Sequence, residues 1–137
     1  MITKISHIGI AVKNLEESIE LYRRMGLECE AIEEVPSQKV KVAFIPVGDV
    51  RIELLAASSP DSPIAKYIEK RGEGIQHLAL AVDDLPKELA KAEDIGLRLI
   101  DKTPRPGAHG ASIAFLHPKS THGVLLELCK ERDHNEE

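Results

Sequence analysis

A hexapeptide near the start of the chain recurs in its second half. His7-Ile8-Gly9-Ile10-Ala11-Val12 corresponds to His77-Leu78-Ala79-Leu80-Ala81-Val82, and the similarity continues beyond both copies. Self-similarity of this kind indicates one structural unit that is used twice, so the two halves should share a fold. The later matching segments are Gly26-Leu27 with Gly96-Leu97, Val42-Ala43-Phe44-Ile45 with Ile113-Ala114-Phe115-Leu116, and Ile52-Glu53-Leu54 with Leu126-Glu127-Leu128.

Each half predicts the order strand, helix, strand, strand, strand. Helices are expected after the N-cap residues Asn14 and Asp84, and Gly26 and Gly96 are expected to end them. Alternating or continuous apolar segments between turn residues predict the strands. The predicted strands are 4–12, 27–34, 39–47, 50–56, 75–82, 97–102, 111–117 and 122–129.

The two repeats predict an α+β fold in which two βαβββ modules form a curved, eight-stranded cavity. Ser62 and Pro63 read as the N-cap and first residue of a short helix between the modules. The expected organisation is one domain over 1–137, composed of a first module (1–58), a helical linker (59–74), a second module (75–130) and a charged tail (131–137).

Composition and charge exclude several classes of protein. The net charge of −5 argues against a nucleic-acid partner, and no apolar run approaches the ~20 residues of a membrane span. The first residues lack the basic flank and long apolar region of a secretory signal. We therefore expect a cytoplasmic protein with no membrane partner.

One His and one Glu recur in each half, both on predicted strands. They are His7 and Glu53 in the first half and His77 and Glu127 in the second. Because alternate residues of a strand share a face, all four could point into one cavity, away from the bulky apolar face of each strand. A single His or Glu on a strand is more often structural or solvated, but four in matching places form a ligand set suited to a divalent ion.

At this point the residues carry a resemblance to a known family. The βαβββ repeat with His and Glu at these places resembles the vicinal-oxygen-chelate (glyoxalase/bleomycin resistance) superfamily over essentially the whole chain. Within it, the sequence is most similar to the methylmalonyl-CoA epimerases. The segments that carry the closer similarity are Ile5–Val12, Gly72–His77, and His117-Pro118-Lys119-Ser120 leading into Gly123–Leu128.

The resemblance implies that His7, His77 and Glu127 bind one divalent metal ion, with Glu53 as a fourth ligand. Position 53 carries Gln in some epimerases, whereas Glu here is also what glyoxalase I carries. Cobalt is favoured by the resemblance, with Mn, Zn, Ni and Mg remaining open.

The implied reaction interconverts (R)- and (S)-methylmalonyl-CoA by removal and return of a proton through a metal-stabilised enolate. Inversion is simplest with two bases, and Glu127 and Glu53 are the carboxylates that both repeats offer to the cavity. Some epimerases are described with a catalytic carboxylate on the strand that matches 39–47, but that strand contains no acid here. The second base is therefore left open between Glu53 and another group.

Further residues are expected to contact the CoA thioester substrate, and the chain is expected to form a homodimer. The expected substrate-binding residues are Gln38, Lys41, Gln76, Arg105 and Lys119.

The sequence leaves two alternatives to the epimerase open. One is a glyoxalase I-like lyase acting on a glutathione hemithioacetal, and the other is a non-catalytic small-molecule binding protein of the same fold.

Overall fold

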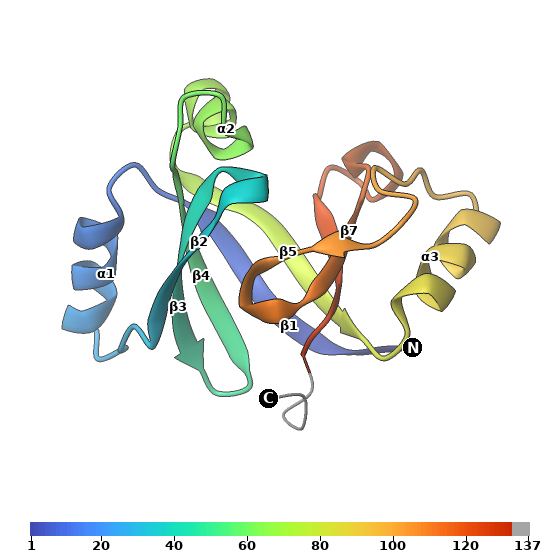
Figure 1. Cartoon of the computed structure of the whole chain (residues 1–137), viewed down its shortest axis with the longest axis horizontal. Coiled ribbons are helices and arrows are strands. Elements are labelled where there is room, and N and C mark those ends of the chain that lie inside the picture. The colour runs from blue at the N-terminus through green and yellow to red at the C-terminus, as the bar shows by residue number, and fades with distance from the viewer. Residues whose placement is uncertain (133–137) are drawn as a thin grey trace. The chain divides into compact units, whose positions relative to one another are not determined.

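Eight strands and three α-helices occur within residues 1–132, the part of the chain that the computed structural model describes. Strand, helix and three further strands follow one another twice, which confirms the predicted βαβββ repeat (Figure 1). The first set comprises β1 (Ile2–Ala11), α1 (Leu15–Arg24), β2 (Ala31–Val35), β3 (Val40–Val47) and β4 (Val50–Ala57). The second set comprises β5 (Gly74–Val82), α3 (Leu85–Asp94), β6 (Arg105–Pro106), β7 (Ser112–Leu116) and β8 (Leu126–Lys130), and α2 (Pro63–Arg71) lies between the sets.

The chain divides into two units whose borders do not follow the order of the sequence. One unit is His7–Gln76, and the other joins Met1–Ser6 to the chain from His77 onward. The division cuts β1 between Ser6 and His7, and it cuts β5 between Gln76 and His77. The predicted module boundaries at 58, 74 and 130 stay a prediction, and residues 133–137 of the predicted tail lie outside the described residues.

In the unit His7–Gln76, one face of the sheet is covered by α1. The second half of β1 runs parallel to β4, and β4, β3 and β2 follow in antiparallel pairs. Asn14 caps α1 by accepting a hydrogen bond from the backbone N–H of Glu17 (3.0 Å). The buried residues on this face are Val12, Leu15, Ala43, Ile45, Leu54 and Ala56.

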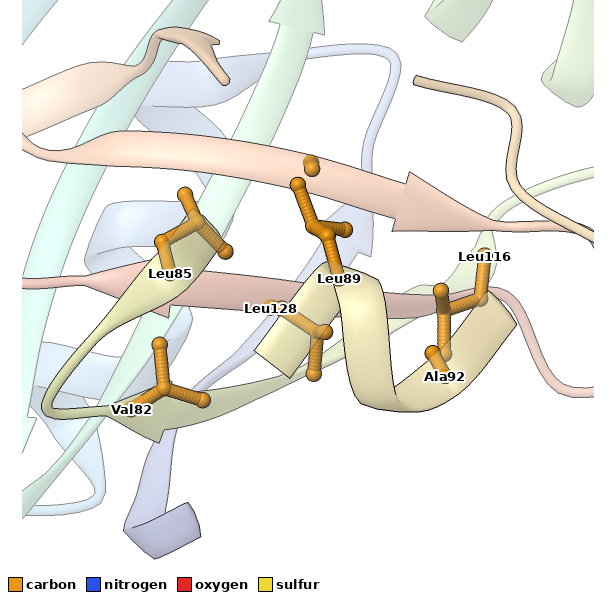
Figure 2. Close-up of a cluster of buried hydrophobic side chains, with 7 residues drawn as sticks. Val82, Leu85, Leu89, Ala92, Leu116 and Leu128 are labelled. Atoms are coloured by element: carbon orange, nitrogen blue, oxygen red, sulfur yellow. The ribbon is translucent and has the colours of Figure 1, made fainter. Parts of the chain in front are cut away.

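The other unit is built in the same way around α3. Strand β5 runs parallel to β8, which pairs antiparallel with β7, and β7 pairs with the short β6. Figure 2 shows Leu85 and Leu89 of α3 directed toward the strands beneath the helix. The buried residues of this cluster are Val82, Leu85, Leu89, Ala92, Ala114, Leu116 and Leu128.

Three predicted strands differ from the structure. The segment 97–102 is no strand, since it makes only an isolated bridge from Leu99 to Leu116. The strand expected at 27–34 begins only at Ala31. The strand expected at 122–129 begins only at Leu126, because His122 (φ 57°) and Gly123 (φ 90°) adopt left-handed conformations that a strand does not permit.

The link between the repeats contains the predicted short helix. Ser62 caps α2 by accepting a hydrogen bond from the backbone N–H of Ile64 (3.1 Å). Gly72 follows the helix with a φ of 77°, a left-handed conformation that suits glycine. Glu73 then accepts a hydrogen bond from the backbone N–H of Lys13 (2.7 Å), which ties the segment after α2 to the end of β1. Within residues 1–132, no helix has the length and apolar character needed to cross a membrane.

Candidate metal and proton-transfer site

The first His–Glu pair lies on the sheet face opposite α1. His7 Nδ1 is 3.2 Å from Glu53 Oε2, and both side chains are almost fully buried. The alternation of each strand explains why His7 and Glu53 point away from α1. Ile10 and Leu54 lie on the opposite face of β1 and β4 and pack toward the helix. The residue beside Glu53 on the neighbouring β1 is Gly9, which has no side chain to cover the carboxylate.

Arg51 is a member of this site that the sequence reasoning missed. Its Nη2 donates to Glu53 Oε2 at 3.1 Å, and its guanidinium lies over the Phe44 ring, 5.9 Å from the centroid. Arg51 and Glu53 share a face of β4 because they are two residues apart, and Phe44 is the register partner of Glu53 on β3. The signal was present in the sequence as two opposite charges flanking Ile52 on an alternating strand.

The second His–Glu pair repeats this arrangement in the other unit. His77 Nε2 is 3.5 Å from Glu127 Oε1, with both side chains almost fully buried. Ala79 is the register partner of Glu127 on the parallel strand, so a small side chain again lies beside the carboxylate. The Phe115 ring meets the His77 ring edge-on at 5.6 Å, and Cys129 shares the face of Glu127.

Burial controls the charge of His77. Desolvation lowers its pKa from 6.5 to about 4, because the imidazolium form loses its hydration when the ring is buried. His77 is therefore neutral at pH 7, and a neutral imidazole is the form that coordinates a metal ion.

The donor set and its spacing fit a divalent ion. Two ligand atoms that each lie about 2.1 Å from one ion are separated by about 3.0 Å at right angles and about 3.4 Å at a tetrahedral angle. The distances within the two pairs, 3.2 Å and 3.5 Å, are near these values. Each pair can thus supply two ligands to a divalent ion.

The predicted substrate-binding residues on strands do not share the faces of the two pairs. Lys41 alternates with Val40 and Val42, so it points to the face of β3 opposite that of Phe44. Gln76 directly precedes His77 on β5 and therefore points away from it. Gln38 lies in the short helix η1 (Pro36–Gln38) and is partly buried.

Arg105 and Lys119 lie in the unit that contains Glu127. The guanidinium of Arg105 lies over the Phe115 ring, 5.4 Å from the centroid, and its Nε is 3.4 Å from Asp101 Oδ1. Since Phe115 is the register partner of Glu127, Arg105 borders the face that carries the second pair. Lys119 is exposed in the short helix η3 (Pro118–Ser120).

Comparison with known proteins adds independent information. Residues 6–115 match the family model of the glyoxalase/bleomycin resistance protein/dioxygenase superfamily. An uncharacterised protein of Bacillus subtilis is 40% identical over 97% of both chains. The ethylmalonyl-CoA/methylmalonyl-CoA epimerase of Cereibacter sphaeroides is 37% identical over 93% of this chain and 98% of the relative.

Solved structures agree with the sequence comparison. A methylmalonyl-CoA epimerase in complex with methylmalonyl-CoA and NH4⁺ superimposes with a TM-score of 0.92 at 36% identity, over 96% of both chains. These similarities favour the expected epimerase over the hemithioacetal lyase and over the binding protein without activity. The chain therefore belongs to the glyoxalase/bleomycin resistance superfamily, with its vicinal-oxygen-chelate fold, and within it to the methylmalonyl-CoA epimerase family, which makes it an isomerase.

Proposed function

We propose that this chain interconverts the two epimers of methylmalonyl-CoA by moving the proton on the carbon between the thioester and the free carboxylate. The observation that carries the proposal is the presence of a buried His–Glu pair at matching places of the two repeats. The similarity to an epimerase solved with methylmalonyl-CoA supports the choice of substrate.

His7, Glu53, His77 and Glu127 are proposed as the four ligands of one divalent ion. Two imidazoles and two carboxylates suit ions of borderline to hard character, so Co, Mn, Zn, Ni and Mg are the candidates, with Co favoured. A bound ion would act as a Lewis acid for the negative charge that develops on the thioester oxygen. The neutral state of His77 supports its part in this set, because no proton has to leave the ring before it coordinates.

Glu127 is proposed as the base that removes the α-proton. A carboxylate oxygen accepts the proton from one face of the substrate carbon, which leaves a planar carbon whose charge is shared with the thioester oxygen. Return of a proton to the opposite face then inverts the carbon. Glu53 is the proposed partner for that second transfer, since it is the matching carboxylate of the other repeat.

Cationic groups outside the two pairs are proposed to bind the remote parts of the substrate. Arg105 and Lys119 would contact the phosphates or the carboxylate of the CoA ester, because both are cations in the unit of Glu127 and both are exposed. Gln38, Lys41 and Gln76 stay predictions as substrate contacts. A homodimer and a cytoplasmic location also stay predictions, and light scattering of the purified protein tests the first.

Proton exchange tests the proposed reaction directly. The metal-loaded enzyme is incubated in deuterated water with one epimer of methylmalonyl-CoA, and deuterium at the α-carbon is followed together with the formation of the other epimer. We expect deuterium incorporation and formation of the other epimer to proceed at comparable rates, and we expect Glu127→Gln to abolish both. Absence of exchange at every metal tested, from either epimer, would refute the proposal.

Metal dependence has its own test. The purified protein is analysed for bound metal and then dialysed against a strong chelator. Because a ligand that binds only the folded state stabilises it by a few kcal/mol at a thousandfold excess over its Kd, we expect both the Tm and the activity to fall and to return on adding Co²⁺. If exhaustive chelation changes neither, the proposed ligand set is wrong.

A further inference from the structure

Arg51 places a positive charge directly against one proposed metal ligand. Nη2 lies 3.1 Å and Nε lies 3.4 Å from Glu53 Oε2, and His7 Nδ1 is 3.2 Å from the same oxygen. The side chain of Arg51 is 20% exposed, whereas that of Glu53 is 5% exposed. One carboxylate oxygen is therefore shared between a guanidinium and an imidazole in a largely desolvated setting.

The cation is held there by more than the carboxylate. The guanidinium lies over the Phe44 ring, and Phe44 is the register partner of Glu53 across β3 and β4. A ring face attracts a cation and restricts its movement. Because Arg51 and Glu53 are two residues apart on β4, the strand itself holds the two groups on one face.

We propose that Arg51 is a positioning residue that acts through Glu53: it offsets the negative charge of this ligand and so keeps the bound ion electron-poor. The inference rests on the metal set given under the proposed function. An ion whose charge is less neutralised by its ligands polarises the thioester oxygen more strongly, at the expense of its own affinity for the site.

The separation of the charges sets the size of the effect. An ion about 2.1 Å from the carboxylate oxygen lies at most about 5 Å from the guanidinium nitrogen that donates to that oxygen. At an effective dielectric constant of about 20, repulsion between a single and a double charge at this range corresponds to several powers of ten in Kd. Because Arg51 is partly exposed and water would replace it, we expect a net change of about tenfold to a hundredfold.

The central variant is Arg51→Met, which keeps an unbranched side chain of similar length and removes the charge. We expect it to bind Co²⁺ about tenfold to a hundredfold more tightly, measured by competition with a chelator, and to lower kcat at saturating Co²⁺ about tenfold. Arg51→Lys keeps the charge and should restore both quantities toward the wild type. A residue that only stabilises the local fold would not give tighter metal binding together with slower turnover.

Two further comparisons show whether the effect passes through Glu53. In a Glu53→Gln background the carboxylate that holds the guanidinium beside the ion is gone, so adding Arg51→Met should change the Co²⁺ affinity far less than it does in the wild type. Arg105→Met is the matched control, because Arg105 also lies over a Phe ring but pairs with Asp101. It should leave the Co²⁺ affinity unchanged, whatever it does to KM.

Each contrary result identifies what has failed. Weaker or unchanged Co²⁺ binding in Arg51→Met, with Glu53→Gln clearly weakening it, overturns the role of Arg51 and leaves the metal set standing. A rise in KM for the CoA ester with unchanged Co²⁺ affinity assigns Arg51 to the substrate and also overturns the inference. If Glu53→Ala, which removes every ligand atom of this side chain, leaves the Co²⁺ affinity untouched, Glu53 is no ligand, and the proposed metal set fails together with the inference.

Discussion

Acidification of the metal-free protein should lower its free energy of unfolding, because His77 is buried in its neutral form. In the folded chain its pKa is lowered from 6.5 to about 4 by desolvation. Between these values the unfolded chain binds a proton at this residue and the folded chain does not. The free energy of unfolding therefore falls as the pH is lowered through this window, by up to about 3 kcal/mol once the pH reaches 4. Glu127, 3.5 Å away, attracts the same proton, so this figure is an upper bound.

Urea denaturation of the chelated protein at several pH values between 4.5 and 7.5 measures this loss. His77→Gln removes the titrating group and should flatten the dependence on pH, whatever its effect on stability at pH 7.5. His122→Asn is the control: His122 is exposed, and asparagine tolerates its left-handed conformation, so the dependence should persist. Equal slopes for wild type and His77→Gln would show that burial of this ring does not govern acid stability.

Four further substitutions test other parts of the molecule. Glu127→Gln should keep the fold and lower kcat about 10²- to 10⁴-fold, because an amide cannot accept the α-proton; the same kcat assay on Glu53→Gln should show a smaller loss, and the reverse order would exchange the two roles. Lys119→Ala should raise KM for the CoA ester with little change in kcat, since it would remove binding remote from the reacting carbon; a large fall in kcat at constant KM would contradict this placement. Leu89→Ala should lower the free energy of unfolding by about 2–5 kcal/mol in urea titrations, because Leu89 is buried between α3 and its sheet; a loss below 1 kcal/mol would show that the site collapses around the smaller side chain.

Strand parity explains how much of the site the sequence could predict. Around His7 and His77, bulky and small residues alternate with a period of two, and this pattern separates the helix-covered face from the face of the His–Glu pairs. The structure confirms the separation, because Val12 packs beneath α1 and Leu128 packs beneath α3. The parallel alignment of β1 with β4 and of β5 with β8 then brings the His and the Glu of each repeat together.

The irregular segment 97–102 and the contact of Arg51 with Glu53 depend on interactions that the periodicity of the sequence does not encode. The segment 97–102 has the apolar composition of a strand, yet its N–H groups bond irregularly: both Ile100 and Asp101 donate to the carbonyl of Phe115. Asp101 also accepts from the backbone N–H of Phe115 through its side chain (2.9 Å), which replaces a ladder bond. The spacing of Arg51 and Glu53 places them on one face, but their contact also requires a particular side-chain conformation, which the spacing does not fix.

The arginine that lies over a phenyl ring comes from a different strand position in each half of the chain. Phe44 and Phe115 occupy the same place in the two repeats, but the arginines above them do not. By strand register, Arg51 corresponds to Leu125, and Arg105 corresponds to Glu33, a residue of opposite charge. The two repeats therefore share the ring, whereas the cation above it comes from β4 in the first repeat and from β6 in the second. Each carboxylate-bearing face thus has a cation beside it that the repeat does not supply, and an idealised symmetric chain built from the residues common to both halves would contain neither arginine.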